Sequence, residues 1–197
     1  MRVIGGEYKG RTLIVGTGKG LRPTSDRIRK SLFDILGGEV EGAQFLDIFA
    51  GTGAVGIEAL SRGAVRATFI EISRRTSEAL RRNLTRLGIA HQAEVLVGDA
   101  RKWLKRLFER GAFFDIVFLD PPYGTDLGKR TLEVLAAHGS VVRPGGWVIV
   151  QHLSKEALTD QWGPLTLAKR RRIGEHCLSF YLRERTKEDR KETESFD

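Results

Sequence analysis

The spacing of apolar residues changes along the chain and divides it into two kinds of segment. From about residue 44 onward, short apolar runs alternate with longer segments whose apolar residues recur every three or four positions. The first pattern is typical of buried strands and the second of amphipathic helices. The predicted strands are Phe45–Phe49, Ala67–Ile70, Ala93–Val97, Phe114–Leu119 and Trp147–Val150, and the predicted helices are Ala54–Leu60, Ser73–Leu87, Arg101–Phe108 and Gly128–Ala137.

The alternation of strands and helices indicates an α/β fold, because a helix between two strands carries the chain back to the start of a parallel neighbour. Two later β-prone runs, Leu165–Ala168 and Cys177–Leu182, have no helix of normal length between them. They predict an antiparallel pair at one edge of the sheet. We therefore expect seven strands, mostly parallel, with helices on both faces.

The first 24 residues have a different character. The short runs Arg2–Ile4 and Thr12–Val15 are separated by glycines and predict a small β-hairpin, followed by a basic, glycine-rich loop. Thr24 or Ser25 then caps a helix that ends at Gly37-Gly38. We expect a hairpin and basic loop over 1–24, one α/β domain over 25–183, and a flexible, charged tail over 184–197.

The loop after the first predicted strand carries the pattern G-x-G-x-x-G at Gly51, Gly53 and Gly56. Such a loop lets a ligand approach the backbone closely, and in NAD-binding proteins it cradles a pyrophosphate. Asp47 lies four residues before Gly51, where a negative charge opposes a pyrophosphate but suits a ligand with an ammonium and a sulfonium group. The loop therefore favours S-adenosylmethionine over NAD.

Two further acids support this prediction. Glu71 ends the second strand, where it can accept hydrogen bonds from ribose hydroxyls, and Asp99 ends the third, within reach of an adenine amino group. Either acid alone is more often a helix cap. The candidate cofactor-binding residues on these loops are Asp47, Phe49, Ala50, Gly51, Gly53, Glu71, Ile72, Asp99 and Ala100.

The fourth strand is followed by Asp120, Pro121, Pro122 and Tyr123. The prolines stiffen the backbone and remove two N–H donors. The Asp120 carboxylate and the Pro121 carbonyl can then hold one NH₂ group, while Tyr123 stacks on the ring that carries it. These four residues are the candidate catalytic residues for methyl transfer to a planar amino nitrogen.

Composition adds a preference for a polyanionic partner. The 197 residues carry a net charge of +8, and residues 1–30 hold eight Lys or Arg against Glu7 and Asp26. The single cysteine suits a reducing cytosol, and we expect a cytoplasmic protein without a membrane segment. The four histidines have no metal-ligand spacing, so no metal site is expected. The candidate RNA-binding residues are Arg2, Lys9, Arg11, Arg22, Arg27 and Lys30.

The stretch from Asp47 to Tyr123 resembles Rossmann-like class I methyltransferases with an Asp/Asn-Pro-Pro-Tyr/Phe motif. Residues 1–6, 9–11 and 21–27 resemble the RsmD family of bacterial methyltransferases. That resemblance implies methylation of guanine N2 in small-subunit (16S) ribosomal RNA, with an assembled subunit or a late precursor as the partner. It also implies that Arg22, Thr24, Asp26 and Arg27 lie beside the cofactor and the RNA. Gln151 and His152 stand where relatives often carry an acid.

Other functions remain open at this point. A DNA adenine-N6 methyltransferase shares the catalytic tetrapeptide but needs an added region for reading sequence. A protein glutamine methyltransferase faces the same nitrogen chemistry but commonly begins the motif with Asn. An NAD-dependent oxidoreductase is disfavoured by Asp47, and a non-catalytic RNA-binding protein does not need residues 120–123. We expect a monomer, because a small protein must dock on a large particle.

Overall fold

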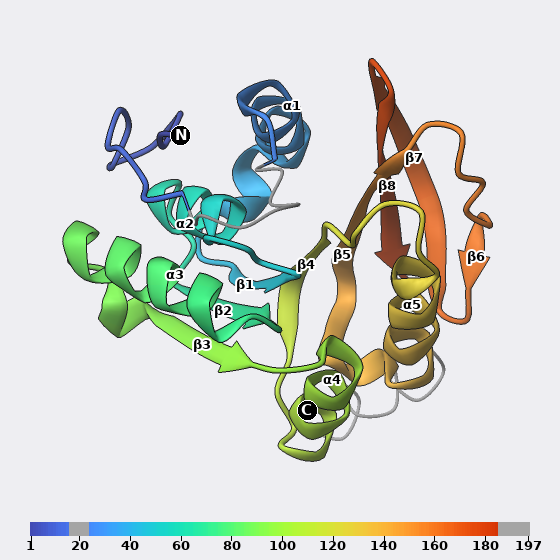
Figure 1. Cartoon of the computed structure of the whole chain (residues 1–197). Coiled ribbons are helices and arrows are strands. Elements are labelled where there is room, and N and C mark those ends of the chain that lie inside the picture. The colour runs from blue at the N-terminus through green and yellow to red at the C-terminus, as the bar shows by residue number, and fades with distance from the viewer. Residues whose placement is uncertain (16–23, 185–197) are drawn as a thin grey trace, which may run out of the picture.

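A single eight-stranded sheet organises the computed structural model, which describes residues 1–15 and 24–184. Its strand order is β3-β2-β1-β4-β5-β8-β7-β6, and β1 to β5 run parallel to one another (Figure 1). The strands are β1 (Gln44–Ile48), β2 (Arg66–Glu71), β3 (Ala93–Val97), β4 (Phe114–Leu119), β5 (Val142–Leu153), β6 (Gln161–Trp162), β7 (Leu165–Ile173) and β8 (His176–Arg183).

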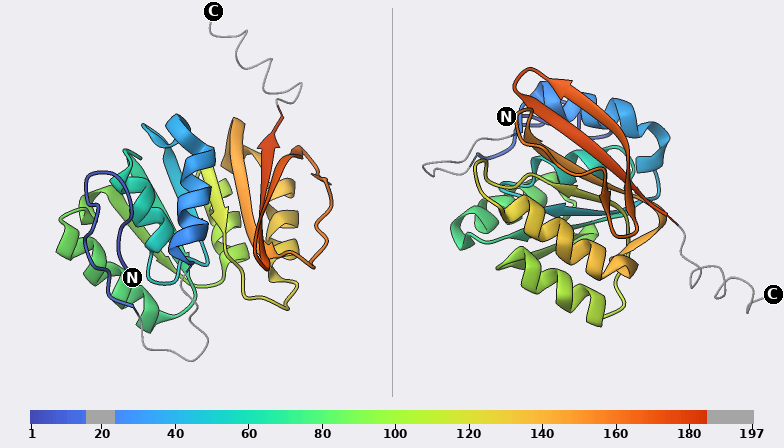
Figure 2. Two further views of the ribbon diagram at one scale, coloured as in Figure 1. Left: turned by 90° about the horizontal axis from the view of Figure 1, so that it is seen from above. Right: turned by 90° about the vertical axis from the view of Figure 1, so that its right-hand side faces the viewer.

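Helices cover both faces of this sheet, as Figure 2 shows in two directions. The helices α1 (Asp26–Leu36), α2 (Ala54–Ser61) and α3 (Arg74–Leu87) pack on one face, and α4 (Ala100–Glu109) and α5 (Leu127–Ala137) pack on the other. Short 3-10 turns lie at Gly37–Val40, Ala90–Gln92 and Gly139–Val141. Ser25 caps α1 by accepting a hydrogen bond from the backbone N–H of Ile28. The predicted α/β fold with helices on both faces is confirmed.

The structure differs from the prediction in two respects, the number of strands in the sheet and the form of the N-terminal hairpin. It has eight strands rather than seven, because residues 161–162 add a short strand beside β7. The predicted antiparallel pair is confirmed at the sheet edge, with β8 lying between β5 and β7. The N-terminal hairpin contains a single antiparallel bridge, between Arg2 and Thr12, rather than two strands. Three backbone hydrogen bonds join the two runs, from Val3 to Arg11, from Gly10 to Val3 and from Leu13 to Met1.

A buried ion pair connects α1 to α2. The side chains of Arg29 and Glu58 are both fully buried, and their charged atoms lie 3.6 Å apart. Arg29 also donates hydrogen bonds to Asp26 and to the backbone carbonyl of Arg2, while Glu58 accepts from the backbone N–H of Ile4. A charged residue between Arg27 and Lys30 in an amphipathic helix is expected on the solvated face, but Arg29 is fully buried. The N-terminal segment covers this face, and its Arg2 carbonyl accepts a hydrogen bond from the guanidinium.

We predict that Arg29→Met destabilises the fold, because it leaves the Glu58 carboxylate buried with less compensation. Breaking such a pair costs about 3–5 kcal/mol, whereas removing an exposed pair costs at most about 1 kcal/mol. Urea denaturation measures the free energy of unfolding. Lys30→Met is the matched control, since Lys30 forms an exposed pair with Asp34 on the same helix. Adding Glu58→Gln to Arg29→Met restores part of the lost free energy of unfolding. If Arg29→Met and Lys30→Met destabilise the protein equally, the buried-pair interpretation is wrong.

Candidate active site

A cavity of about 530 Å³ opens at the carboxyl ends of the parallel strands β1, β2 and β4. This is the place where open α/β sheets bind their ligands, and the volume suits a nucleoside-sized molecule. The cavity brings together most of the residues predicted from the sequence. Its lining includes Thr24, Asp47, Phe49, Ala50, Gly51, Glu71, Ile72, Asp120, Pro121, Pro122 and Tyr123.

The glycine-rich loop between β1 and α2 forms one wall of the cavity. Gly51 has a positive φ of 57°, and a Cβ added there would meet no atom within 4 Å. A ligand can therefore approach its backbone. Gly53 caps α2 and does not line the cavity; a Cβ there would lie 2.2 Å from the Leu80 side chain. Phe49 also has a positive φ, of 64°, which is strained for a residue with a side chain and is found most often at functional sites.

Asp47 and Glu71 hold this loop in place through backbone hydrogen bonds. The Asp47 carboxylate accepts from the Gly56 N–H at 2.9 Å, and Glu71 accepts from the N–H groups of Gly51 and Ser73 at 2.9 and 2.8 Å. Both side chains are at least nine-tenths buried and still line the cavity. Each carboxylate keeps lone pairs that can accept bonds from a ligand.

Asp47 lies in an environment that disfavours its negative charge. Burial raises its pKa to about 8, and the nearby charges of Asp120 and Glu71 act in the same direction, while the Gly56 hydrogen bond opposes them. A cation bound in the cavity would favour the ionised carboxylate. The three acids therefore form a site for a positively charged ligand and disfavour a pyrophosphate.

Asp120 begins the segment after β4, and the hydroxyl of Thr24 donates a hydrogen bond to its Oδ2 at 2.7 Å. Burial raises the pKa of Asp120 to about 6, and this hydrogen bond partly opposes the shift. Thr24 thus acts on the candidate catalytic carboxylate directly. The sequence placed Thr24 beside the cofactor only through family resemblance, and it does line the same cavity.

Tyr123 is held by residues from the distant strands β5 and β8. The Gln151 side-chain amide donates to the Tyr123 hydroxyl at 2.6 Å, and the His176 ring lies 5.3 Å from the Tyr123 ring. His152, beside Gln151, is buried and bonded to the Ser179 hydroxyl. Strand β5 extends three residues beyond its predicted end at Val150, which brings Gln151 to the tyrosine.

Asn83 is a further residue that the sequence did not single out. Its amide donates to the carbonyls of Ile14 and Thr52 and accepts from the Ile14 N–H. It therefore ties the end of the N-terminal segment to the glycine-rich loop. An Asn inside an amphipathic helix gives no local signal of such a contact; only its position on the buried face of α3 could have indicated it.

Several predicted residues lie outside the cavity lining. Asp99 caps α4 by accepting from the N–H groups of Arg101 and Lys102, and it pairs with the Arg101 side chain. Neither Asp99 nor Ala100 lines the cavity. Arg2, Lys9 and Arg11 are exposed on the N-terminal segment, and Arg27 and Lys30 are exposed on α1. Arg22 lies outside the described residues.

In the described parts of the chain, no group of three or more His, Cys, Asp or Glu side chains is arranged to hold a metal ion. Within the same residues, no helix combines the length and apolarity required to cross a membrane.

The parallel sheet with an antiparallel edge, the glycine-rich loop after β1 and the Asp-Pro-Pro-Tyr segment after β4 together define a class I methyltransferase fold. The chain belongs to the family described as Conserved hypothetical protein 95, whose model matches residues 1–182. This confirms the resemblance to the RsmD family.

Individual relatives agree with this assignment. Ribosomal RNA small subunit methyltransferase D of Escherichia coli K12 is 44% identical over 71% of this chain and 68% of its own length. Its Haemophilus influenzae counterpart is 35% identical over 88% and 89% of the two chains. A solved Escherichia coli structure, named as a candidate methyltransferase, superposes with a TM-score of 0.83 at 36% identity, covering 94% and 99% of the two chains.

We predict that Asp47→Asn stabilises the ligand-free protein at alkaline pH. The folded-state pKa of about 8 lies above the reference value of 3.8, so folding favours the protonated carboxyl, and this stability is fully present below pH 3.8 and is lost progressively as the pH rises to about 8. Asn keeps an oxygen for the Gly56 N–H but never ionises. The melting temperatures of the variant and the wild type coincide near pH 4 and differ by several degrees at pH 9. Each kcal/mol of unfolding free energy shifts the melting temperature by about 2–4 °C. A difference that does not change with pH contradicts the assignment.

Proposed function

We propose that this protein transfers a methyl group from S-adenosylmethionine to the exocyclic N2 of a guanine in small-subunit (16S) ribosomal RNA. The observation that carries the proposal is the cavity that joins the acid-lined glycine loop to the segment 120–123. A cationic cofactor and a planar amino group can meet there. The family assignment supports the same reaction.

The residues present fit the cofactor. Asp47 offers a carboxylate to a ligand that carries an ammonium and a sulfonium group, and Glu71 offers lone pairs to ribose hydroxyls. Gly51 leaves open space where a side chain would block the ligand. S-adenosylmethionine supplies an activated methyl group on a sulfonium, which leaves as the neutral thioether. Asp99 and Ala100 follow Gly98, whose N–H donates to the carbonyl of the cavity residue Glu71, and we retain them as candidate contacts for the adenine ring.

The chain's own residues would act mainly by positioning the nucleophile. A guanine amino group is a weak nucleophile, because its lone pair is delocalised into the ring. The Asp120 carboxylate and the Pro121 carbonyl hold its two protons, so that the lone pair points toward the methyl group. The Tyr123 ring, fixed by Gln151, stacks on the base. The amino nitrogen would take the methyl group as the neutral thioether leaves, and one N–H proton would pass to Asp120 and then to water.

The substrate assignment rests on the family and on charge. The two curated relatives described above are named as methyltransferases of the small ribosomal subunit. The net charge of +8 suits an RNA partner, and Arg2, Lys9, Arg11, Arg22, Arg27 and Lys30 are the residues that we propose to contact it. The proposal includes a monomer acting in the cytoplasm on the subunit or its late precursor, with residues 25–183 forming the methyltransferase domain.

We predict that labelled S-adenosylmethionine transfers its methyl group to undermodified small subunits, and that digestion yields N2-methylguanine. Asp120→Ala lowers the transfer rate at least 100-fold, since removal of one preorganised electrostatic group typically costs about 10²–10³ in rate. The variant keeps its affinity for the cofactor in calorimetry, because Asp120 addresses the base.

Label on adenine, on protein or on DNA refutes the assigned substrate. Loss of cofactor affinity in Asp120→Ala refutes the assigned role of the residue. Wild-type protein assayed on fully modified subunits is the control for background transfer.

We also predict that Thr24→Val shifts the pH dependence of transfer. An ionised Asp120 is the better acceptor, so the rate rises with pH through about 6 in the wild type. Removing the Thr24 hydroxyl removes a bond that lowers this pKa, and the rising limb moves to higher pH. The variant therefore loses more activity at pH 6 than at pH 8. In Asp120→Asn the residual transfer rate does not rise with pH in this range. If Thr24→Val and Asp120→Asn both keep the wild-type pH dependence, a group other than Asp120 titrates.

A further inference from the structure

Two basic segments that lie about 140 residues apart in the sequence form the walls of one groove on the α1 face of the sheet. Arg27 and Lys30 come from α1, and Lys169, Arg171 and Arg172 come from β7; together they line a hollow of about 320 Å³. All five side chains are exposed. One acid, Asp34, lines the same groove, and it pairs with Lys30 at 3.0 Å.

The register of β7 explains why its cations face α1. Lys169 pairs with Phe180 and Arg171 with Leu178 on β8, and directly paired residues of antiparallel strands share a face. Phe180 and Leu178 belong to the core on the α1 side. Arg170, between the two cations, points to the opposite face and pairs with Asp160. In the part of the chain that the structure describes, Lys169, Arg171 and Arg27 form no ion pair.

Both walls of the groove begin beside the candidate catalytic residues. Arg27 lies three residues after Thr24, whose hydroxyl donates a hydrogen bond to Asp120. On the other wall, Arg171 pairs with Leu178, and Leu178 pairs with Gln151, which holds Tyr123. The groove thus starts at the same edge of the sheet as the active-site cavity and runs away from it between α1 and β7.

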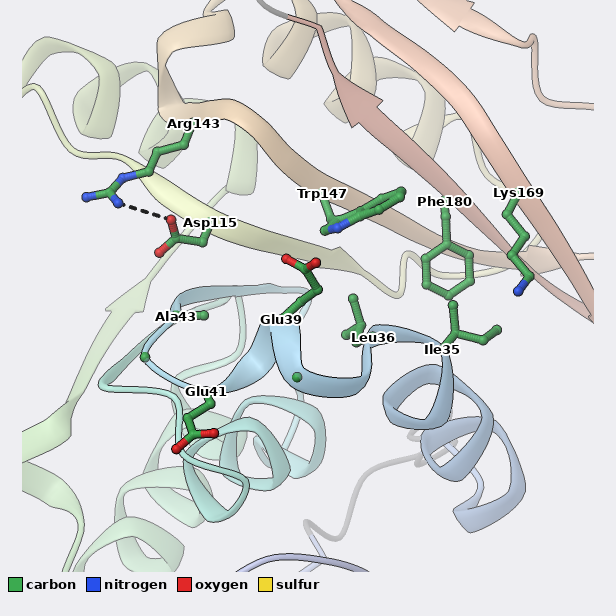
Figure 3. A pocket seen from close by; sticks show the side chains of 12 residues that line it. Ile35, Leu36, Glu39, Glu41, Ala43, Asp115, Arg143, Trp147, Lys169 and Phe180 are labelled. Carbon is green, nitrogen blue, oxygen red and sulfur yellow. Dashed lines mark ion pairs between the residues drawn. The ribbon is translucent and has the colours of Figure 1, made fainter.

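The sign of the charge changes at the far end of the groove. Ile35 and Lys169 also line the next cavity, of about 740 Å³, which Figure 3 shows between α1 and the strands β5 and β8. Glu39 and Glu41 lie there, and Asp115 pairs with Arg143. Trp147 and Phe180 form its apolar floor. The groove therefore attracts phosphates as far as Lys169, and the acidic side chains of the next cavity repel them.

We propose that this basic groove binds the RNA sugar–phosphate backbone next to the target nucleotide, while the base enters the cavity at Asp120. The proposal rests on the RNA substrate proposed above. Phosphate contacts of this kind set the position of a nucleic acid without reading its sequence. Their contribution weakens with salt, because binding releases the counterions of the phosphates. The groove therefore contributes to substrate affinity and leaves the chemical step unchanged.

The test compares two charge-matched double variants. Lys169→Glu with Arg171→Glu reverses the charge of the β7 wall of the groove, and Lys102→Glu with Lys105→Glu places the same charge change on exposed residues of α4, on the opposite face of the sheet. Binding to undermodified small subunits and to naked small-subunit ribosomal RNA is measured across a salt series. We expect the groove variant to lose at least tenfold more affinity than the control. The slope of log affinity against log salt concentration becomes shallower by about 0.7 for each lost single-strand phosphate contact. The KM for RNA rises while kcat at saturating RNA and cofactor affinity stay within twofold.

Each outcome decides one question. Equal losses in the two double variants, an unchanged salt slope or a fall in kcat alone overturns the groove as a backbone site. A loss seen with subunits but not with naked RNA indicates an acidic ribosomal protein as the partner and also overturns it. Lys169→Gln with Arg171→Gln serves where the reversed variant does not fold, with the same ranking expected. If wild-type protein binds RNA through the groove but transfers no methyl group to it, the proposed function fails and the groove assignment stands.

Discussion

The buried contact between Arg29 and Glu58 sets the relative positions of three parts of the molecule. Arg29 belongs to α1, which begins just after Thr24, and Glu58 belongs to α2, which begins in the glycine-rich loop. The same two side chains bind backbone groups of Arg2 and Ile4. Removing two charges from water is costly, so this pair is stable only when all its partners are in place. One interaction thus fixes both the wall that carries Thr24 and the wall that carries the loop.

The parallel sheet then brings the acids together. Strands β1, β2 and β4 are neighbours and end at one edge, so Asp47, Glu71 and Asp120 reach the same cavity although they are far apart in sequence. Burial and mutual repulsion raise the pKa of Asp47 to about 8. Helix α2 starts from a loop that Asp47 and Glu71 hold by hydrogen bonds, so the same carboxylates support the loop and disfavour an empty cavity. A cationic ligand relieves that repulsion.

Residues whose roles follow from local pattern were predictable, and residues whose roles depend on distant partners were not. Asp47, Glu71 and residues 120–123 stand at the ends of strongly apolar strands, and the order of strands and helices places them together. Arg29 looked solvated, because nothing in α1 reveals that the N-terminal segment covers it. Gln151 was without a role until the length of β5 was known. The side on which Lys169 and Arg171 lie depends on a register shift between Leu167 and Lys169, which no alternation rule anticipates.

The separation of charge between the cavity and the groove constrains how a nucleic acid can approach. The cavity presents three acidic side chains, whereas the groove beside it presents four more cations than acids, counting Arg27, Lys30, Lys169, Arg171 and Arg172 against Asp34. A phosphate is repelled by the first and attracted by the second. A neutral base is the part of a nucleotide that can enter the cavity without electrostatic cost. The same arrangement that suits a sulfonium cofactor therefore favours substrates whose base can leave the helix or already lies in a single strand, with the backbone held outside.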